Sequence, residues 1–167
     1  MSGTTASCSA SKLEPIVNGS FDGTWTGWSQ SGGNGTRSVS NTTAYAGTYS
    51  ALIDYNMGCT KEKIYQNITV PNVAGTVSLE FWERTYLVSW AGEGGIMIND
   101  AWLFYVNYAT AGRKNITTAW AKQTLDISAY KGQTIELAIA WYDGNPTYCM
   151  VGDHDGWIMI DELKLVY

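Results

Sequence analysis

The residues best placed for chemistry are two aspartates near opposite ends of the chain. Asp22 follows a short apolar stretch at residues 16–17, and Asp161 lies inside the apolar closing stretch at residues 156–167. Burying a carboxylate without a partner costs several kcal/mol, so Asp161 requires a cation. Calcium prefers carboxylate and carbonyl oxygens. We therefore predict that the first and last strands are neighbours and that both aspartates bind one calcium ion, the alternative being two solvated turn residues.

A second acidic pair, Asp153 and Asp155, lies just before the closing stretch. The two carboxylates are two residues apart and Gly156 follows them, which resembles half of a calcium loop. The bidentate glutamate that completes such a loop is missing at the expected spacing. An ordinary Asp-Gly turn is therefore the favoured interpretation, with a second calcium site as the alternative.

The closing stretch predicts a strand with a bulge. Ile158 and Ile160 share one parity of residue number, whereas Leu163 and Leu165 share the other. Successive side chains of a strand point to opposite faces, so an extra residue is needed to keep all four on one face. We predict a bulge or kink at residues 161–162.

The elements that must position these residues are predicted to be strands. Apolar side chains alternate with period two, as Val77, Leu79 and Phe81 do, and no segment has a convincing 3.6-residue period. Turn signals separate about ten short segments, which predicts one all-β sandwich domain at residues 13–167. The expected strands are residues 13–17, 37–41, 64–70, 76–87, 102–108, 119–125, 134–142 and 156–167, with a turn and strand at 44–55, a Gly-rich loop at 91–95 and one helical turn at 126–131.

Residues 1–12 form a separate N-terminal tail of small, polar composition. Ala6, Cys8 and Ala10 alternate with hydroxyl-bearing residues, which is typical of a strand with one semi-apolar face. We expect an extended donor strand that completes a sheet edge of this domain or of a neighbouring subunit. The alternative is a disordered leader.

The composition restricts the function classes. The 167 residues are 45% hydrophobic and only 15% charged, with 8 Trp and 11 Tyr. Some of these rings must lie at the surface, where they serve recognition or contact between subunits. The net charge of -5 argues against nucleic acid as a partner, because phosphate binding needs a basic surface. No apolar run is long enough to span a membrane.

Sequons and cysteines bear on the location of the protein. The low charge and five Asn-X-Ser/Thr sequons favour the cell exterior. Cys59 and Cys149 fall in predicted loops and are a candidate disulfide, which leaves Cys8 free or paired between chains. Three reduced thiols are an equally good interpretation, because three cysteines define no framework. The sequons are at Asn18, Asn34, Asn41, Asn67 and Asn115.

One predicted strand presents an aromatic side chain between two charges. Glu80, Trp82 and Arg84 share its outward face, and Tyr142 is a candidate neighbour. An aromatic platform flanked by hydrogen-bonding charges suits a pyranose, which needs stacking for its C–H face and polar partners for its hydroxyls. The alternatives are a face covered by a donated strand or a neighbouring subunit, and a simple Glu–Arg cross-strand pair. Trp102, beside the Gly-rich segment, is a candidate for lining a cleft or an interface.

Catalytic signatures are missing from the sequence. His154 is the only histidine, and no Gly-X-Ser-X-Gly motif occurs. Glu80 and Glu83 are three residues apart on a strand, so they point to opposite faces rather than toward one glycosidic bond. No Cys/His cluster has zinc spacing. We predict a protein that is not an enzyme.

Four segments resemble jelly-roll carbohydrate-binding modules of the xylan- and glucan-binding type. They are residues 16–22 (IVNGSFD), 46–51 (AGTYSA), 125–134 (LDISAYKGQT) and 158–165 (IMIDELKL), where Glu162 replaces the second aspartate of the family pattern. The resemblance covers the chain from residue 13 onward. It implies a calcium-stabilised jelly-roll β-sandwich, with a structural calcium at positions that match Asp22, Thr48 and Asp161.

The N-terminal tail also makes the chain resemble the archaeal cannula proteins, whose jelly-roll subunits polymerise into extracellular tubes. That resemblance implies an N-terminal strand given to a neighbour, with calcium at the contacts. A head-to-tail contact of this kind builds filaments or tubes. We therefore favour an extracellular structural protein that self-assembles. The alternative is a non-catalytic carbohydrate-binding module with Trp82 in its platform.

Overall fold

The computed structural model describes residues 14–33, 35–55, 61–87, 92–107, 116–142 and 156–167. Three sequence predictions concern residues outside these ranges and stay predictions: the donor strand, the candidate disulfide and the second acidic pair. Their residues are Ala6, Cys8, Ala10, Cys59, Cys149, Asp153 and Asp155.

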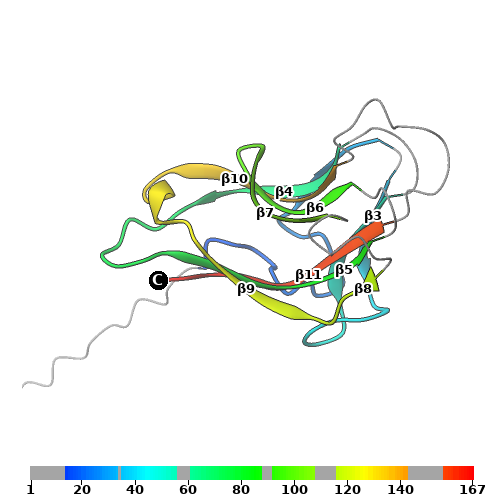
Figure 1. The fold of residues 1–167 in the computed structure, drawn as a ribbon. Helices are drawn as coiled ribbons and strands as arrows, with labels where there is room; N and C mark the ends of the chain where they lie inside the picture. Colours follow the sequence, from blue (N-terminus) through cyan, green and yellow to red (C-terminus); the bar gives the residue numbers. More distant parts are fainter. Residues whose placement is uncertain (1–13, 34, 56–60, 88–91, 108–115, 143–155) are drawn as a thin grey trace, which may run out of the picture.

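Two antiparallel sheets are stacked as a sandwich (Figure 1), which confirms the all-β prediction. A 3₁₀ turn, Ser128–Tyr130, lies within the predicted helical turn. No helix of the described residues is long and apolar enough to cross a membrane. The five-stranded sheet has the order β1 (Ser29–Ser31), β4 (Lys61–Thr69), β10 (Thr134–Tyr142), β6 (Glu93–Ile98), β7 (Ala101–Asn107). The six-stranded sheet has the order β2 (Thr36–Ser40), β3 (Ser50–Tyr55), β11 (Gly156–Val166), β5 (Ser78–Leu87), β8 (Ile116–Thr117), with β9 (Ala121–Asp126) also paired to β5.

The core lies between the sheets and consists of the side chains that the period-two alternation predicted. Leu79 and Phe81 of β5 are fully buried, as are Leu137, Ile139 and Trp141 of β10. Burying each large apolar side chain contributes about 1.5–3 kcal/mol relative to its exposure. The alternation therefore stabilises the sandwich and also determines which side chains remain on its two outer faces.

The Gly-rich segment is a strand rather than the predicted loop. Glu93–Ile98 forms β6, between β10 and β7. A Cβ atom at Gly94 would lie 2.5 Å from the Trp141 ring, and one at Gly156 would lie 2.6 Å from it. The glycines are thus needed for close packing against a large indole, and they do not mark a turn.

The predicted first strand at residues 13–17 is also wrong, although its position beside the last strand is confirmed. The backbone from Pro15 to Ser20 forms bends and a turn. The side-chain amide of Gln66 bonds both backbone groups of Val17, accepting from its N–H at 3.0 Å and donating to its carbonyl at 3.2 Å. Leu163 of β11 donates its N–H to the carbonyl of Gly19 at 3.0 Å. The Gln66 side chain thus provides the hydrogen bonds to the Val17 backbone that a neighbouring strand would otherwise provide.

β11 contains the predicted bulge. Its register on β5 shifts between Asp161 and Lys164, and Glu162 has a positive φ of 52°. Ile160 before the bulge and Leu163 after it are both buried in the core. The extra residue therefore keeps both halves of the strand facing inward.

A buried ion pair joins the two sheets. Arg37 of β2 contacts the carboxylate of Glu62 on β4. Glu62 is completely buried and also accepts the N–H groups of Gly33 at 2.7 Å and Gly35 at 3.1 Å. One carboxylate thus fixes the edge of the six-stranded sheet and the connection from β1 to β2.

We expect Arg37→Met to lower the free energy of unfolding by about 3–5 kcal/mol, because the Glu62 carboxylate stays buried without its cation. Chemical denaturation of this variant, of Glu62→Leu and of the double variant measures the effect. The double variant should recover much of the loss, since apolar side chains can replace a buried pair. A double variant as unstable as the sum of the single variants would contradict a sheet-joining ion pair.

Glu83 is a second buried carboxylate, on the inward face of β5. It is 5% exposed and accepts a hydrogen bond from Thr85 Oγ1 at 3.0 Å. Burial raises the pKa of Glu83, and hydrogen bonds from Thr85 and Gln123 oppose that rise only in part. The outward Glu80 differs, because its bond with Lys122 lowers its pKa.

These pKa directions predict opposite pH dependences of stability. A raised pKa in the folded state means that the folded protein binds the Glu83 proton more tightly than the unfolded chain does. Stability from Glu83 is therefore fully present below the ordinary glutamate pKa and is lost as pH rises through the raised pKa. Thermal unfolding of Glu83→Gln across this range should show a smaller loss of stability with rising pH than the wild type shows.

Glu80→Gln is the matched control for that experiment. The lowered pKa of Glu80 contributes stability above the ordinary glutamate pKa, which is lost as pH falls. The two variants should therefore change the slope of stability against pH in opposite directions. Equal slopes in wild type and Glu83→Gln would rule out the assigned role of the buried carboxyl group.

Candidate functional site

The sequence-predicted binding residues divide between the two outer faces of the sandwich. Glu80, Trp82 and Arg84 lie on the outward face of β5 in the six-stranded sheet. Trp102 of β7 and Tyr142 of β10 belong to the five-stranded sheet. The expectation that Tyr142 neighbours Trp82 is therefore wrong. Alternation along a strand indicates which of its side chains point outward, but it does not indicate to which of the two sheets the strand belongs.

The outer face of the five-stranded sheet carries aromatic rings beside a floor of one methionine and two alanines. Tyr65, Ala138, Met97 and Trp102 form one row across four strands. Tyr65 and Trp102 pack against the floor, which consists of Met97, Ala138 and Ala140. The two alanines fill little space beside these rings. We call this surface the Trp102 face.

The next row of the Trp102 face adds an exposed ring. Lys63, Ala140, Gly95 and Tyr105 are cross-strand neighbours. Tyr105 is 43% exposed, and its ring centroid lies 6.0 Å from that of Trp102. Two adjacent rings thus reach solvent at the edge strand β7.

Charged and amide groups surround these rings. Lys63 Nζ bonds Glu136 at 2.5 Å and Asp100 at 3.2 Å, and Asn107 bonds Glu93 at 3.2 Å. Burial lowers the pKa of Lys63, but its bonds to the two carboxylates outweigh that effect and raise it. Lys63 is therefore a charged donor at neutral pH. Donors and acceptors for hydrogen bonds thus lie beside the partly exposed rings.

The outer face of the six-stranded sheet is covered in its centre by residues 41–49. The carboxylate of Asp161 accepts the backbone N–H groups of Tyr45 at 2.9 Å and Ala46 at 3.0 Å. Tyr45 stacks on Trp82 with centroids 3.6 Å apart and planes at 11°. One side of the Trp82 ring is thus covered by this chain itself, which the sequence did not predict.

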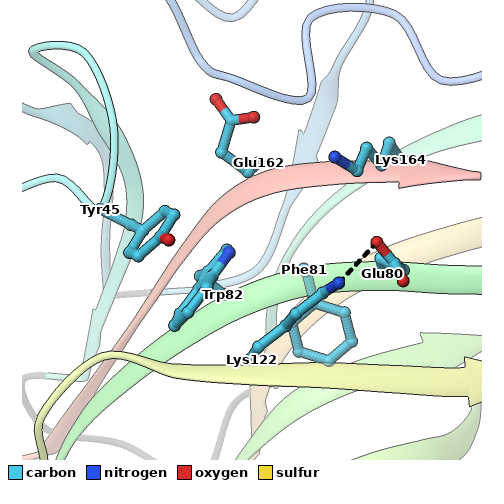
Figure 2. A pocket seen from close by; sticks show the side chains of 7 residues that line it. All are labelled: Tyr45, Glu80, Phe81, Trp82, Lys122, Glu162 and Lys164. Carbon is cyan, nitrogen blue, oxygen red and sulfur yellow. Dashed lines mark ion pairs between the residues drawn. The ribbon is translucent and has the colours of Figure 1, made fainter.

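A pocket of about 270 Å³ lies beside this stacked pair, and Figure 2 shows its side chains. They come from the loop before β3 and from β5, β9 and β11. We call it the Trp82 pocket, and it is lined by Tyr45, Glu80, Phe81, Trp82, Lys122, Glu162 and Lys164.

Arg84 does not line the Trp82 pocket. Its Nε donates to the carbonyl of Thr118 at 3.2 Å, and its Nη1 donates to Thr43 Oγ1 at 3.2 Å. The guanidinium also lies over the Trp157 ring, 5.9 Å from its centroid. Arg84 therefore ties residues 41–49 to the sheet, which is a structural role.

The three predicted calcium ligands are in different situations. Asp161 is buried and has backbone partners on both oxygens, including the N–H of Glu162 at 2.8 Å. Asp22 is exposed and accepts a bond from Ser20 Oγ at 2.9 Å, and Thr48 is exposed. The described residues contain no group of three or more His, Cys, Asp or Glu side chains that could hold a metal.

The Asp161 carboxylate has hydrogen-bond donors from this chain in addition to any cation that binds there, which the sequence did not predict. Three N–H groups supply the partners that its buried carboxylate requires. Calcium binding through Asp22, Thr48 and Asp161 stays a prediction.

We expect Asp161→Asn to lower the free energy of unfolding by about 1–3 kcal/mol, because an amide NH₂ leaves buried N–H donors without an acceptor. Denaturation in excess chelator and in millimolar calcium should give the same loss. A loss that occurs only with calcium would instead assign the carboxylate to the metal.

The sequence patterns did not indicate a binding role for Tyr45, Tyr65 or Tyr105. Alternation along β4 and β10 did indicate that Lys63 and Tyr65, and also Ala138 and Ala140, point outward. This was the sequence signal available for the Trp102 face. No signal of period two was available for Tyr45, because it lies in a loop that tertiary contacts place over the sheet.

No protein-family model and no curated protein sequence matches the chain. Solved structures match it by fold. The module TmCBM61, solved with β-1,4-galactotriose, is 17% identical with a TM-score of 0.53, over 93% of this chain and 99% of that one. The family 11 carbohydrate-binding module of Lic26A-Cel5E from Clostridium thermocellum is 12% identical with a TM-score of 0.52, over 90% and 93%.

The chain has the jelly-roll fold of carbohydrate-binding modules. The enzymatically active domain of bacteriophage CBA120 tailspike protein 4 also matches, at 14% identity and a TM-score of 0.59, over 92% of this chain but 21% of that one. Because the same sandwich occurs in both settings, the fold does not decide function. Function therefore depends on the side chains of the two outer faces.

Proposed function

We propose that this protein is a non-catalytic carbohydrate-binding module that binds a polysaccharide across the Trp102 face. The observation that carries the proposal is the pair of neighbouring rings, Trp102 and Tyr105, beside a floor of alanines and a border of charged and amide groups. A pyranose presents C–H groups on its faces and hydroxyls at its edge, and this surface offers partners for both.

The fold supports this class of ligand. TmCBM61 was solved with β-1,4-galactotriose, and a family 11 module from Clostridium thermocellum was solved with a β-1,3-1,4-mixed-linked tetrasaccharide. An extracellular location follows from a polysaccharide ligand. The sequons at Asn41 and Asn67, whose side chains are exposed, agree with that location.

The Trp102 face supports sugar binding better than the surface that the sequence analysis favoured. Trp82 is stacked under Tyr45, and Arg84 is engaged with residues 41–49, so neither is free to form an open platform. Self-assembly through residues 1–12 remains a separate prediction about residues outside the described ranges.

We expect Trp102→Ala to weaken polysaccharide binding at least about tenfold, or about 1.4 kcal/mol, because it removes one of the two neighbouring rings of the face. Titration calorimetry with β-1,4-galactotriose, a mixed-linked glucan tetrasaccharide and a xylan oligosaccharide measures the change. Trp157→Ala is the matched control, since it removes a half-buried tryptophan from the opposite outer face.

Binding of none of the three oligosaccharides by the wild type would refute the proposal for these sugar classes. Equal loss in Trp102→Ala and Trp157→Ala would show that the effect is on folding or on another surface. Circular dichroism of both variants confirms that the comparison is between folded proteins.

A further inference from the structure

The Trp82 pocket combines aromatic walls with balanced charge on the face of the sandwich opposite to the Trp102 face. We propose that it is a second saccharide-binding site, which takes a single sugar unit or the end of a chain. Its existence does not depend on binding at the Trp102 face, because the two surfaces belong to different sheets.

The aromatic wall is held in place before any ligand binds. Tyr45 is 43% exposed and stacks on Trp82, and the edge of Trp120 packs near it with centroids 6.5 Å apart and planes at 66°. The backbone N–H of Tyr45 is bonded to Asp161, which holds the backbone that carries the ring against the sheet. Such preorganisation lowers the entropic cost of binding.

The charges of the pocket favour a neutral ligand with many hydroxyls. The pocket contains two carboxylates, Glu80 and Glu162, and two ammonium groups, Lys122 and Lys164. Lys122 Nζ lies 2.9 Å from Glu80, and the bond lowers the pKa of that carboxyl group. With equal numbers of each charge, the pocket attracts neither an anion nor a cation strongly, but it offers acceptors and donors for hydroxyls.

The bulge of β11 brings Glu162 to the rim of this pocket. Glu162 has a positive φ and occupies the extra position between Asp161 and Lys164. Figure 2 shows Glu162 and Lys164 extending from the same strand, and both line the pocket together with Tyr45 and Trp82. Bulges commonly redirect a side chain next to a binding site. In a strand without the extra residue, only one side chain would point outward here, whereas the bulge allows both Glu162 and Lys164 to do so.

The size of the pocket limits the ligand. Its volume of about 270 Å³ is just below the roughly 300–1,000 Å³ that is typical of pockets for drug-sized ligands. It therefore suits one sugar ring, whereas the open Trp102 face suits a chain that runs across several strands. Two sites on opposite faces would allow one molecule to bridge two polysaccharide chains.

The test is a titration of ¹⁵N-labelled protein, in which each indole N–H gives its own NMR signal. The probes are glucose, galactose and xylose, together with the three oligosaccharides used for the Trp102 face. We expect a sugar to shift the Trp82 indole signal with saturation, and Trp102→Ala to leave that shift unchanged. Glu162→Gln should weaken binding at Trp82 by about tenfold, while Trp157→Ala should not change it.

The outcomes separate the two proposals. Shifts at Trp82 that persist in Trp102→Ala and weaken in Glu162→Gln support the second site. Shifts confined to Trp102 and its neighbours support the first face and overturn the second site. Shifts at Trp82 that disappear in Trp102→Ala mean indirect coupling and also overturn it. No saturable shift at either residue with any probe overturns both.

Discussion

The hydrogen bonds of the Asp161 carboxylate are the constraint on which both the strand arrangement and the outer surface depend. Asp161 lies at the bulge of β11, a central strand of the six-stranded sheet, and accepts N–H groups from Tyr45, Ala46 and Glu162. A buried carboxylate is costly unless donors surround it, so the chain must bring residues 41–49 over the sheet. That placement stacks Tyr45 on Trp82 and shapes the pocket beside them.

The other buried carboxylates illustrate two further solutions to the same problem. Glu62 has a cation and two glycine N–H groups, and it joins the sheets as a result. Glu83 has hydroxyl and amide partners, and burial raises its pKa. A sandwich with few charges therefore uses three of its acidic groups internally.

The two outer faces differ because different residues cover the two sheets. Small residues of β6 and β10 leave room for rings on the five-stranded sheet, so Tyr65 and Trp102 form an open surface. The six-stranded sheet is covered by a loop, which divides its outer face and leaves a pocket of limited volume beside Trp82. One fold thus offers a flat surface and a small pocket, which suit different lengths of the same class of ligand.

The sequence by itself determined the all-β sandwich, the inward side chains of β5 and β10, and the bulge at residues 161–162, because alternation is a local property of a strand. It did not determine which strands share a sheet, so Trp82 and Tyr142 were wrongly placed together. It also did not show the donors of Asp161 at Tyr45 and Ala46, which lie more than a hundred positions away in the chain. Only the tertiary structure decides such contacts, because sheet membership and buried hydrogen bonds depend on how distant segments pack.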